Sequence, residues 1–70
     1  MQKWEYLTVI VGHNNGKVNS IDANGNRILS KAKVSELYEY LNKIGFNGWE
    51  MVSVRFSDPT EYYYFKRPKA

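Results

Sequence analysis

The segment LNKIGFNGWEMVSV, from Leu41 to Val54, decides the fold because the chain changes both its period and its direction within it. Its first residues end a stretch with helical spacing, and its last residues alternate as a strand does. Gly45 and Gly48 separate the two patterns, and glycine accepts backbone angles that other residues resist. The segment predicts a helix that ends near Gly45, a chain reversal, and a strand that begins at Trp49.

The predicted helix is amphipathic and begins at Val34. Apolar residues recur along one side of it, and polar residues occupy the other side. Gly45 suits a left-handed residue that caps the end of the helix. The apolar side is formed by Val34, Leu37, Leu41 and Ile44, and the polar side by Ser35, Glu36, Glu39, Asn42 and Lys43.

Strands are predicted on both sides of this helix from their β-branched and aromatic content. The strands are residues 4–11, 51–57 and 61–67, with a turn at Asp58 and Pro59 between the last two. GHNNGK, residues 12–17, is expected to be a loop. Asn24 and Gly25 suit the type I′ turn of a short hairpin formed by residues 18–21 and 26–29, because both central positions of that turn need positive φ.

The length and composition allow one small domain. The chain has 70 residues, no Cys, one His, and ten Lys and Arg against seven Asp and Glu. Small domains usually need disulfides, a metal or self-association for stability. Without Cys there is no disulfide or thiolate, which fits a cytoplasmic protein, and the apolar run near the N-terminus is too short for a membrane span or a signal peptide. We therefore expect self-association, in a protein that does not enter a membrane.

The elements predict an α+β fold, β-hairpin-β-α-β-β, in which the single helix packs on one face of an antiparallel sheet. The whole chain, residues 1–70, forms one domain with an inserted hairpin at about residues 12–30. Alternate residues of a strand point to opposite faces of the sheet. One apolar face, which the helix covers, is expected to hold Leu7, Val9, Val11, Val52, Val54, Phe56, Tyr63 and Phe65.

The second face of the sheet is expected to be aromatic, whereas the solvent face of a one-sided sheet is usually polar. An exposed apolar face of this size exceeds what a soluble monomer normally shows. A second subunit, a ligand or the inserted hairpin folded back would cover it. The candidate interface or ligand-binding residues are Trp4, Tyr6, Met51, Arg55, Tyr62, Tyr64 and Lys66.

Three motifs support the strand and helix assignments: WEY at residues 4–6, LNKIGFNGWEMVSV at 41–54, and YYYFKRP ending at Pro68. Together they resemble the small bacterial family known as domain of unknown function 4177, over about two thirds of the chain. The resemblance implies a single-domain chain built as strand, helix, strand, strand, to which residues 12–30 add a hairpin. It implies no activity, and no residue takes a catalytic role from it.

Motifs for catalysis or cofactor binding are not present, so we expect no enzyme, no cofactor and no metal. GHNNGK is one residue short of a phosphate-binding loop and lacks the following Ser or Thr. DANGN has its glycine at the wrong position for a calcium loop. His13 lies among Asn and Gly residues, so we expect a solvated loop residue.

The function predicted from these residues is that of a homo-oligomeric binding or assembly module that uses the aromatic face. The alternative is the binding of single-stranded nucleic acid, because EYYYFKRPK interleaves aromatic and basic residues. A third possibility combines the two: paired faces that enclose a nucleotide-like anion near Arg55 and Lys66. An interface predicts stability that depends on concentration, whereas nucleic-acid binding falls steeply with salt.

Overall fold

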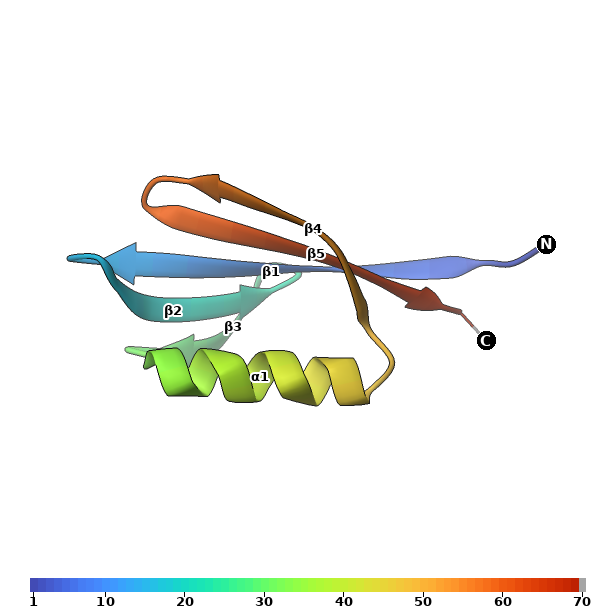
Figure 1. The fold of residues 1–70 in the computed structure, drawn as a ribbon, viewed down its shortest axis with the longest axis horizontal. Coiled ribbons are helices and arrows are strands. Elements are labelled where there is room, and N and C mark those ends of the chain that lie inside the picture. The colour runs from blue at the N-terminus through green and yellow to red at the C-terminus, as the bar shows by residue number, and fades with distance from the viewer. Residues whose placement is uncertain (70) are drawn as a thin grey trace.

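The computed structural model describes residues 1–69, which form one helix and five strands. In chain order the elements are β1 (Trp4–Asn14), β2 (Lys17–Ala23), β3 (Asn26–Ser30), α1 (Val34–Phe46), β4 (Glu50–Ser57) and β5 (Thr60–Pro68). The strands form one antiparallel sheet in the order β3-β2-β1-β5-β4, with α1 on one side of it (Figure 1). The predicted α+β class, with one helix packed on an antiparallel sheet, is confirmed.

Two tight hairpins link the first three strands. Asn15 and Gly16 have φ of 55° and 75°, and Asn24 and Gly25 have φ of 48° and 84°. Positive φ at both central residues is typical of type I′ turns, so the hairpin at Asn24 is confirmed. The loop predicted for residues 12–17 is wrong, because β1 continues through Asn14 and β2 begins at Lys17.

The hairpin of β2 and β3 extends the sheet and does not fold back over it. Pairing with β1 runs from Asn14 opposite Lys17 to Val9 opposite Ala23. The turn itself continues the pairing, because the Thr8 amide donates to the Asn24 side-chain oxygen and the Asn24 amide donates to the Thr8 carbonyl, both at 2.9 Å. The inserted hairpin therefore leaves the aromatic face of β1 open.

The left-handed residue that caps the helix lies three positions later than the sequence predicts, and α1 itself continues to Phe46. Gly45 lies inside α1, and Gly48, with φ of 93°, is the left-handed residue. The Gly48 amide donates to the Gly45 carbonyl at 3.0 Å and the Trp49 amide to the Ile44 carbonyl at 3.1 Å, which is the Schellman arrangement. Trp49 then packs against the core at this corner, as a structural residue.

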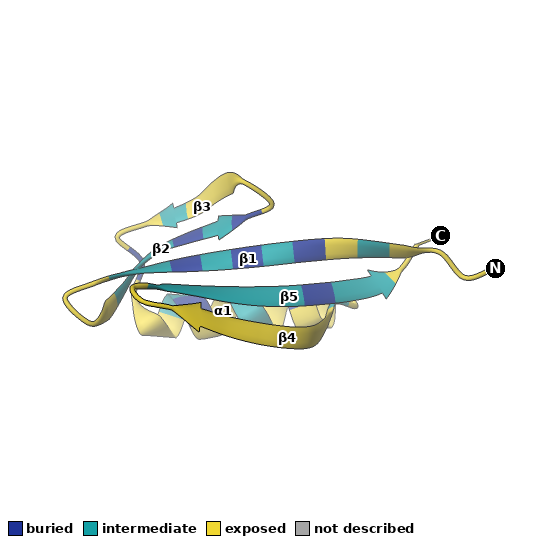
Figure 2. Ribbon diagram, turned by 90° about the horizontal axis from the view of Figure 1, so that it is seen from above, coloured by how far each residue is buried: buried dark blue, intermediate teal, exposed yellow. Residues whose placement is uncertain are grey.

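The core lies between α1 and the middle of the sheet. Alternate residues of β1 face the helix, and their neighbours across the sheet are also buried: Phe65 lies opposite Leu7, and Ile21 lies opposite Val11. Figure 2 shows the buried positions as bands on β1, β2 and β5. The buried apolar residues are Leu7, Val9, Val11, Ile21, Ala23, Ala32, Leu37, Ile44 and Phe65.

β4 is exposed along its whole length of eight residues, so the prediction that the helix covers Val52, Val54 and Phe56 is wrong. A helix with its side chains is about 10 to 12 Å wide, and neighbouring strands lie about 4.8 Å apart. A single helix therefore covers two or three strands, and α1 lies closest to β2. β4, at the far edge of the sheet, is left uncovered.

A β-bulge in β4 changes which face Met51 occupies. Met51 lies opposite Phe65, whereas Ser53 lies opposite Tyr64, so Val52 is an extra residue between two regular pairs. Residues directly opposite one another share a face. Met51 therefore lies on the same side of the sheet as α1, and its predicted place on the aromatic face is wrong.

In the part of the chain that the structure describes, α1 is the one helix, and its 13 residues are too few to cross a membrane.

Candidate functional site

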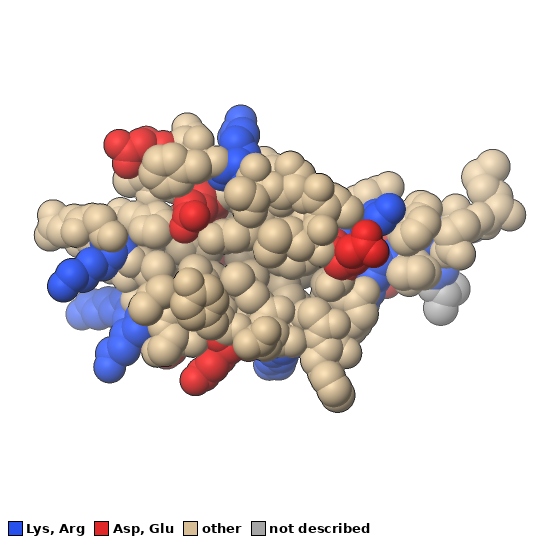
Figure 3. Space-filling model, viewed as in Figure 1, with Lys and Arg blue, Asp and Glu red and all other residues tan. Residues whose placement is uncertain are grey.

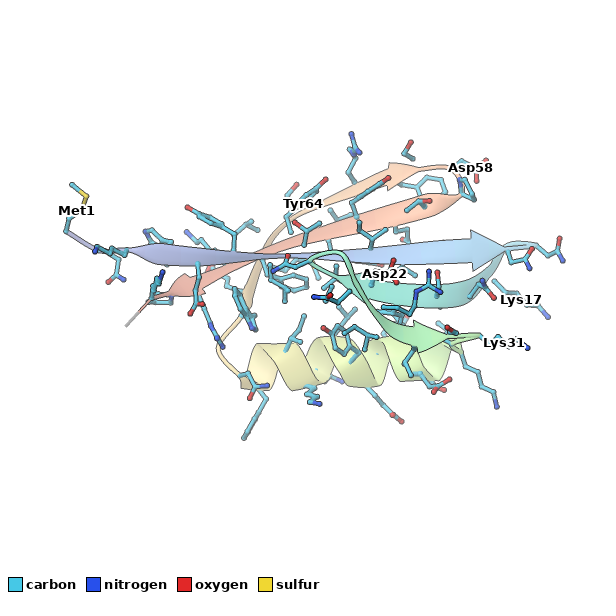
Figure 4. All side chains as sticks on the ribbon, turned by 180° about the vertical axis from the view of Figure 1, so that it is seen from behind. Met1, Lys17, Asp22, Lys31, Asp58 and Tyr64 are labelled. Carbon is cyan, nitrogen blue, oxygen red and sulfur yellow. The ribbon has the colours of Figure 1, made fainter. Side chains whose placement is uncertain are left out.

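The aromatic outer face of the sheet, on the side away from α1, holds six of the seven candidate residues. Cross-strand pairing places them in rows: Tyr6 opposite Lys66, and Ile10 opposite Tyr62, which in turn lies opposite Arg55. Trp4, opposite Pro68, and Tyr64, opposite Thr8, lie on the same face, and Tyr64 points away from α1 (Figure 4). The outer face is thus formed by Trp4, Tyr6, Arg55, Tyr62, Tyr64 and Lys66, without Met51.

Two cation–π contacts occur on this face. The Lys66 ammonium lies 4.4 Å from the centre of the Trp4 ring, and the Arg55 guanidinium lies 4.6 Å from the centre of the Tyr62 ring. Tyr6 remains 68% exposed between them and Trp4 41%. The outer face therefore combines an exposed aromatic centre with cations that already cover part of the aromatic surface.

A second exposed apolar surface lies on the helix side of β4. Met51, Val54 and Phe56 share this side, and with the bulge residue Val52 they are between 45% and 62% exposed. β4 is also an edge strand, so its outer backbone groups have no neighbouring strand within residues 1–69. Long apolar edges of this kind favour pairing with another chain.

A cavity of about 720 Å³ opens between the start of α1, the β1–β2 turn and β5. Its floor includes the buried side chains of Ala32 and Leu37, and its walls are mostly apolar. The lining residues are His13, Gly16, Lys17, Val18, Ala32, Lys33, Val34, Leu37, Tyr38, Glu61 and Tyr63. The cavity exists because β5 diverges from α1 towards the β4–β5 turn (Figure 1).

His13, Glu61 and Tyr63 form the polar end of the cavity. The Nε2 atom of His13 lies 2.7 Å from Oε1 of Glu61, and the His13 ring meets the Phe56 ring edge-on at 6.5 Å. Burial raises the pKa of the Tyr63 phenol, and the charge of Glu61 and a hydrogen bond to it raise the pKa further. The phenol therefore stays neutral at physiological pH.

The prediction that His13 is a solvated loop residue is wrong, because His13 belongs to β1 and its side chain is only 18% exposed. The alternation Leu7, Val9, Val11 continues to His13, and this signal would have placed it on the helix side of the sheet. The Asn-Gly pair at residues 15 and 16, the same dipeptide as at residues 24 and 25, would have placed the turn after His13.

Basic side chains surround the mouth of the cavity. Lys17 and Lys33 line it, and none of the ion pairs formed within residues 1–69 includes either lysine. Lys and Arg side chains gather at this end of the molecule (Figure 3), where Figure 4 labels Lys17 and Lys31. The positive end of the α1 dipole is already partly balanced by Glu36, whose carboxylate accepts a hydrogen bond from the Lys33 amide at 2.9 Å.

Within residues 1–69, no group of three or more His, Cys, Asp and Glu side chains is placed to hold a metal ion. Comparison of the chain with protein-family models, with curated proteins and with solved structures finds no match. The resemblance to the bacterial family therefore stays a prediction, and the candidate sites depend on the geometry described above.

Proposed function

We propose that the chain is a small non-enzymatic module that associates with copies of itself through the outer face of its sheet. The observation that carries this proposal is the exposure of Tyr6, at 68%, on a face that neither α1 nor the inserted hairpin covers. Aromatic side chains present on the order of 150 to 250 Å² each, so the group forms a large apolar surface. Burial against a second copy would remove that surface from water.

The residue types of the outer face and their positions resemble those of a protein–protein interface. Aromatic residues and arginine are enriched in interfaces, and charged groups usually lie at the rim. Tyr6 and Tyr64 occupy neighbouring central rows, with Arg55 and Lys66 beside them. The uncovered β4 supports self-association independently, because an edge strand with apolar side chains is a ready template for another strand.

Single-stranded nucleic acid or a nucleotide-like anion is the second proposed partner for the same face. Arg55 and Lys66 beside exposed aromatic rings favour it, because such surfaces stack bases and neutralise phosphates. The same cations, however, cover the Trp4 and Tyr62 rings on which a base would stack. Self-association does not require these cations to move away from the rings, since the edges of an aromatic ring as well as its faces can be buried in an interface.

The cellular compartment belongs to the same proposal. A chain of 70 residues without Cys needs no oxidising environment to fold, which supports a place in the cytoplasm.

Light scattering on a gel-filtration column, over a range of protein concentrations, tests the proposal. The expected mass is a multiple of 8.2 kDa that falls on dilution, together with a melting temperature that rises with concentration. A constant monomer mass at every concentration would contradict self-association. Titration with a single-stranded oligonucleotide at two salt concentrations then tests the second partner, whose affinity must fall with salt.

A further inference from the structure

The cavity beside the start of α1 lies on the opposite side of the sheet from the outer face, and self-association does not account for it. Its volume of about 720 Å³ falls within the range of about 300 to 1,000 Å³ that is typical of small-molecule sites. It is also built from three separate parts of the chain, the β1–β2 turn, residues 32–38 and β5. A small molecule bound there would contact all three.

The body of such a ligand must be apolar. Leu37 and Ala32, at 4% and 5% exposure, form part of the floor, and Val18 and Tyr63 pack against the same core. Val34 and Tyr38 extend this apolar surface towards the mouth, where each is more than half exposed. An apolar ligand gains free energy in proportion to the area that it removes from water, and it would also bury these two side chains.

The polar end of the cavity does not call for a charged ligand. The Glu61 carboxylate already contacts the His13 ring at 2.7 Å, and it lies near enough to the Tyr63 phenol to help raise the pKa of that phenol. The carboxylate keeps its negative charge while such contacts satisfy its oxygen atoms, so this end would repel an anionic group and leaves the mouth as the place for one. This end therefore closes the cavity, and a ligand can contact the edge of the His13 ring or the Tyr63 hydroxyl there.

The mouth, in contrast, favours an anion. Lys17 and Lys33 lie there without an ion-pair partner among residues 1–69, whereas the N-terminus of α1 already holds the Glu36 carboxylate, which accepts a hydrogen bond from the Lys33 amide at 2.9 Å. A carboxylate placed at the mouth would meet two ammonium groups. An ammonium group in the same place would be repelled by both of them.

From these observations we infer that the cavity binds a small amphipathic monoanion, a medium-chain or aromatic carboxylic acid. Its apolar body lies between α1 and β5, and its carboxylate lies between Lys17 and Lys33 at the mouth. The bound ligand would bridge the helix and the sheet along the side that β4 leaves open.

His13 supplies the reporter for a direct test, because it is the single histidine of the chain and its ring proton signals are unique in the NMR spectrum. Octanoate, octan-1-ol and octylamine are titrated separately at neutral pH. We expect a saturable shift of the His13 signals with octanoate, binding of octan-1-ol that is several-fold weaker, and still weaker binding of octylamine. Equal affinity for all three compounds would overturn the anion class. No shift of His13, or shifts confined to Trp4 and Tyr6, would overturn the site.

The double variant K17Q/K33Q tests the role of the mouth. Its affinity for octanoate is expected to fall roughly three- to twentyfold, since each partly exposed charge contributes modestly, while octan-1-ol binding changes by less than about twofold. The matched control is K3Q/K69Q, which makes the same change in net charge at the other end of the molecule, where the Lys69 amide bonds to the Lys3 carbonyl. Equal losses in the two double variants would overturn the placement of the carboxylate.

Val34→Trp tests the cavity itself, because Val34 lines the mouth and is 54% exposed, so that a larger side chain is tolerated there. We expect it to abolish the His13 response to both octanoate and octan-1-ol. Ile28→Trp, on β3 and outside the cavity, is the matched control and should leave both responses unchanged. Full binding by Val34→Trp would overturn the proposal.

Discussion

The His13 Nε2 atom lies 2.7 Å from Glu61 Oε1, so a side-chain pair joins β1 to β5 on the side of the sheet that faces α1. Both side chains are more than 70% buried, and the residues are separated by 48 positions in the chain. The pair therefore fixes the ends of two neighbouring strands at the edge of the cavity. Its contribution to stability should exceed that of an ion pair in solvent, because water screens it less.

A double-mutant cycle measures this contribution. With His13→Ala, Glu61→Ala and the double variant, we expect a coupling free energy of about 1 kcal/mol or more in urea unfolding. The matched cycle on Asp22 and Arg27, a pair with the arginine 56% exposed, should give less than about 1 kcal/mol. A coupling energy for His13 and Glu61 no larger than that of the control would show that the pair is not structural.

Because of Tyr63, the unfolding free energy should fall as the pH rises into the alkaline range. The pKa of Tyr63 in the folded protein is raised above the ordinary value of 10.0, first by burial and then by Glu61, so the folded state holds the phenol proton more tightly than the unfolded state. The stabilisation is fully present below pH 10 and is lost as pH rises through the higher folded pKa. In Tyr63→Phe the fall in unfolding free energy above pH 10 should be shallower than in the unmodified chain.

Tyr6→Phe is the control for this titration, run at a protein concentration low enough to keep the chain monomeric, because Tyr6 is then largely exposed on the outer face. Its unfolding free energy should follow the same alkaline profile as that of the unmodified chain. If both variants show the same slope above pH 10, Tyr63 does not carry the effect.

Much of the fold follows from the sequence because local signals agree with the global arrangement. The spacing of Leu37, Leu41 and Ile44 predicts the helix, and the alternation of β1 predicts which of its residues are buried. The end of the helix was predicted at the wrong glycine, since Gly45 and Gly48 both satisfy the local rule. The choice depends on hydrogen bonds from Gly48 and Trp49 that no local pattern specifies.

The faces of the sheet could be predicted only in part, for two physical reasons. The bulge at Val52 moves the residues that precede it in β4 to the opposite face from the one that simple alternation predicts. No residue type in the segment EMVSV indicates that a bulge occurs there. The width of a helix then decides how many strands are covered, so Val54 and Phe56 follow the correct alternation and are still exposed. The cavity was not predicted, because it joins residues of β1, α1 and β5 that are distant in the chain.

Gly48 and Gly45 provide a direct comparison of two glycines at one helix end. Gly48→Ala should lower the unfolding free energy by about 1 to 2 kcal/mol, because a residue with a Cβ atom is strained at the φ of 93° found there. An added Cβ would meet no closer atom than Arg67 Cδ at 4.0 Å, so the cost comes from the backbone and not from a clash.

Gly45→Ala should have the opposite effect and raise the unfolding free energy by about 0.5 to 1 kcal/mol. Gly45 lies inside α1, and a Cβ there would meet open space. Urea unfolding of both variants distinguishes the two positions. A destabilised Gly45→Ala with a neutral Gly48→Ala would mean that the helix ends at Gly45 after all.

The outer face makes the strongest prediction about function. Tyr6→Glu places a charge in the centre of the proposed contact, where an aromatic anchor typically contributes about 2 kcal/mol or more, so self-association should weaken at least roughly 30-fold. The fold should persist, because Tyr6 is 68% exposed and contributes little to the core. Phe46→Glu, at the end of α1 and 93% exposed, is the matched control and should keep the mass of the unmodified chain in light scattering. If Tyr6→Glu keeps that mass and Val54→Glu loses it, the contact lies along β4, and the aromatic face is left free for another partner.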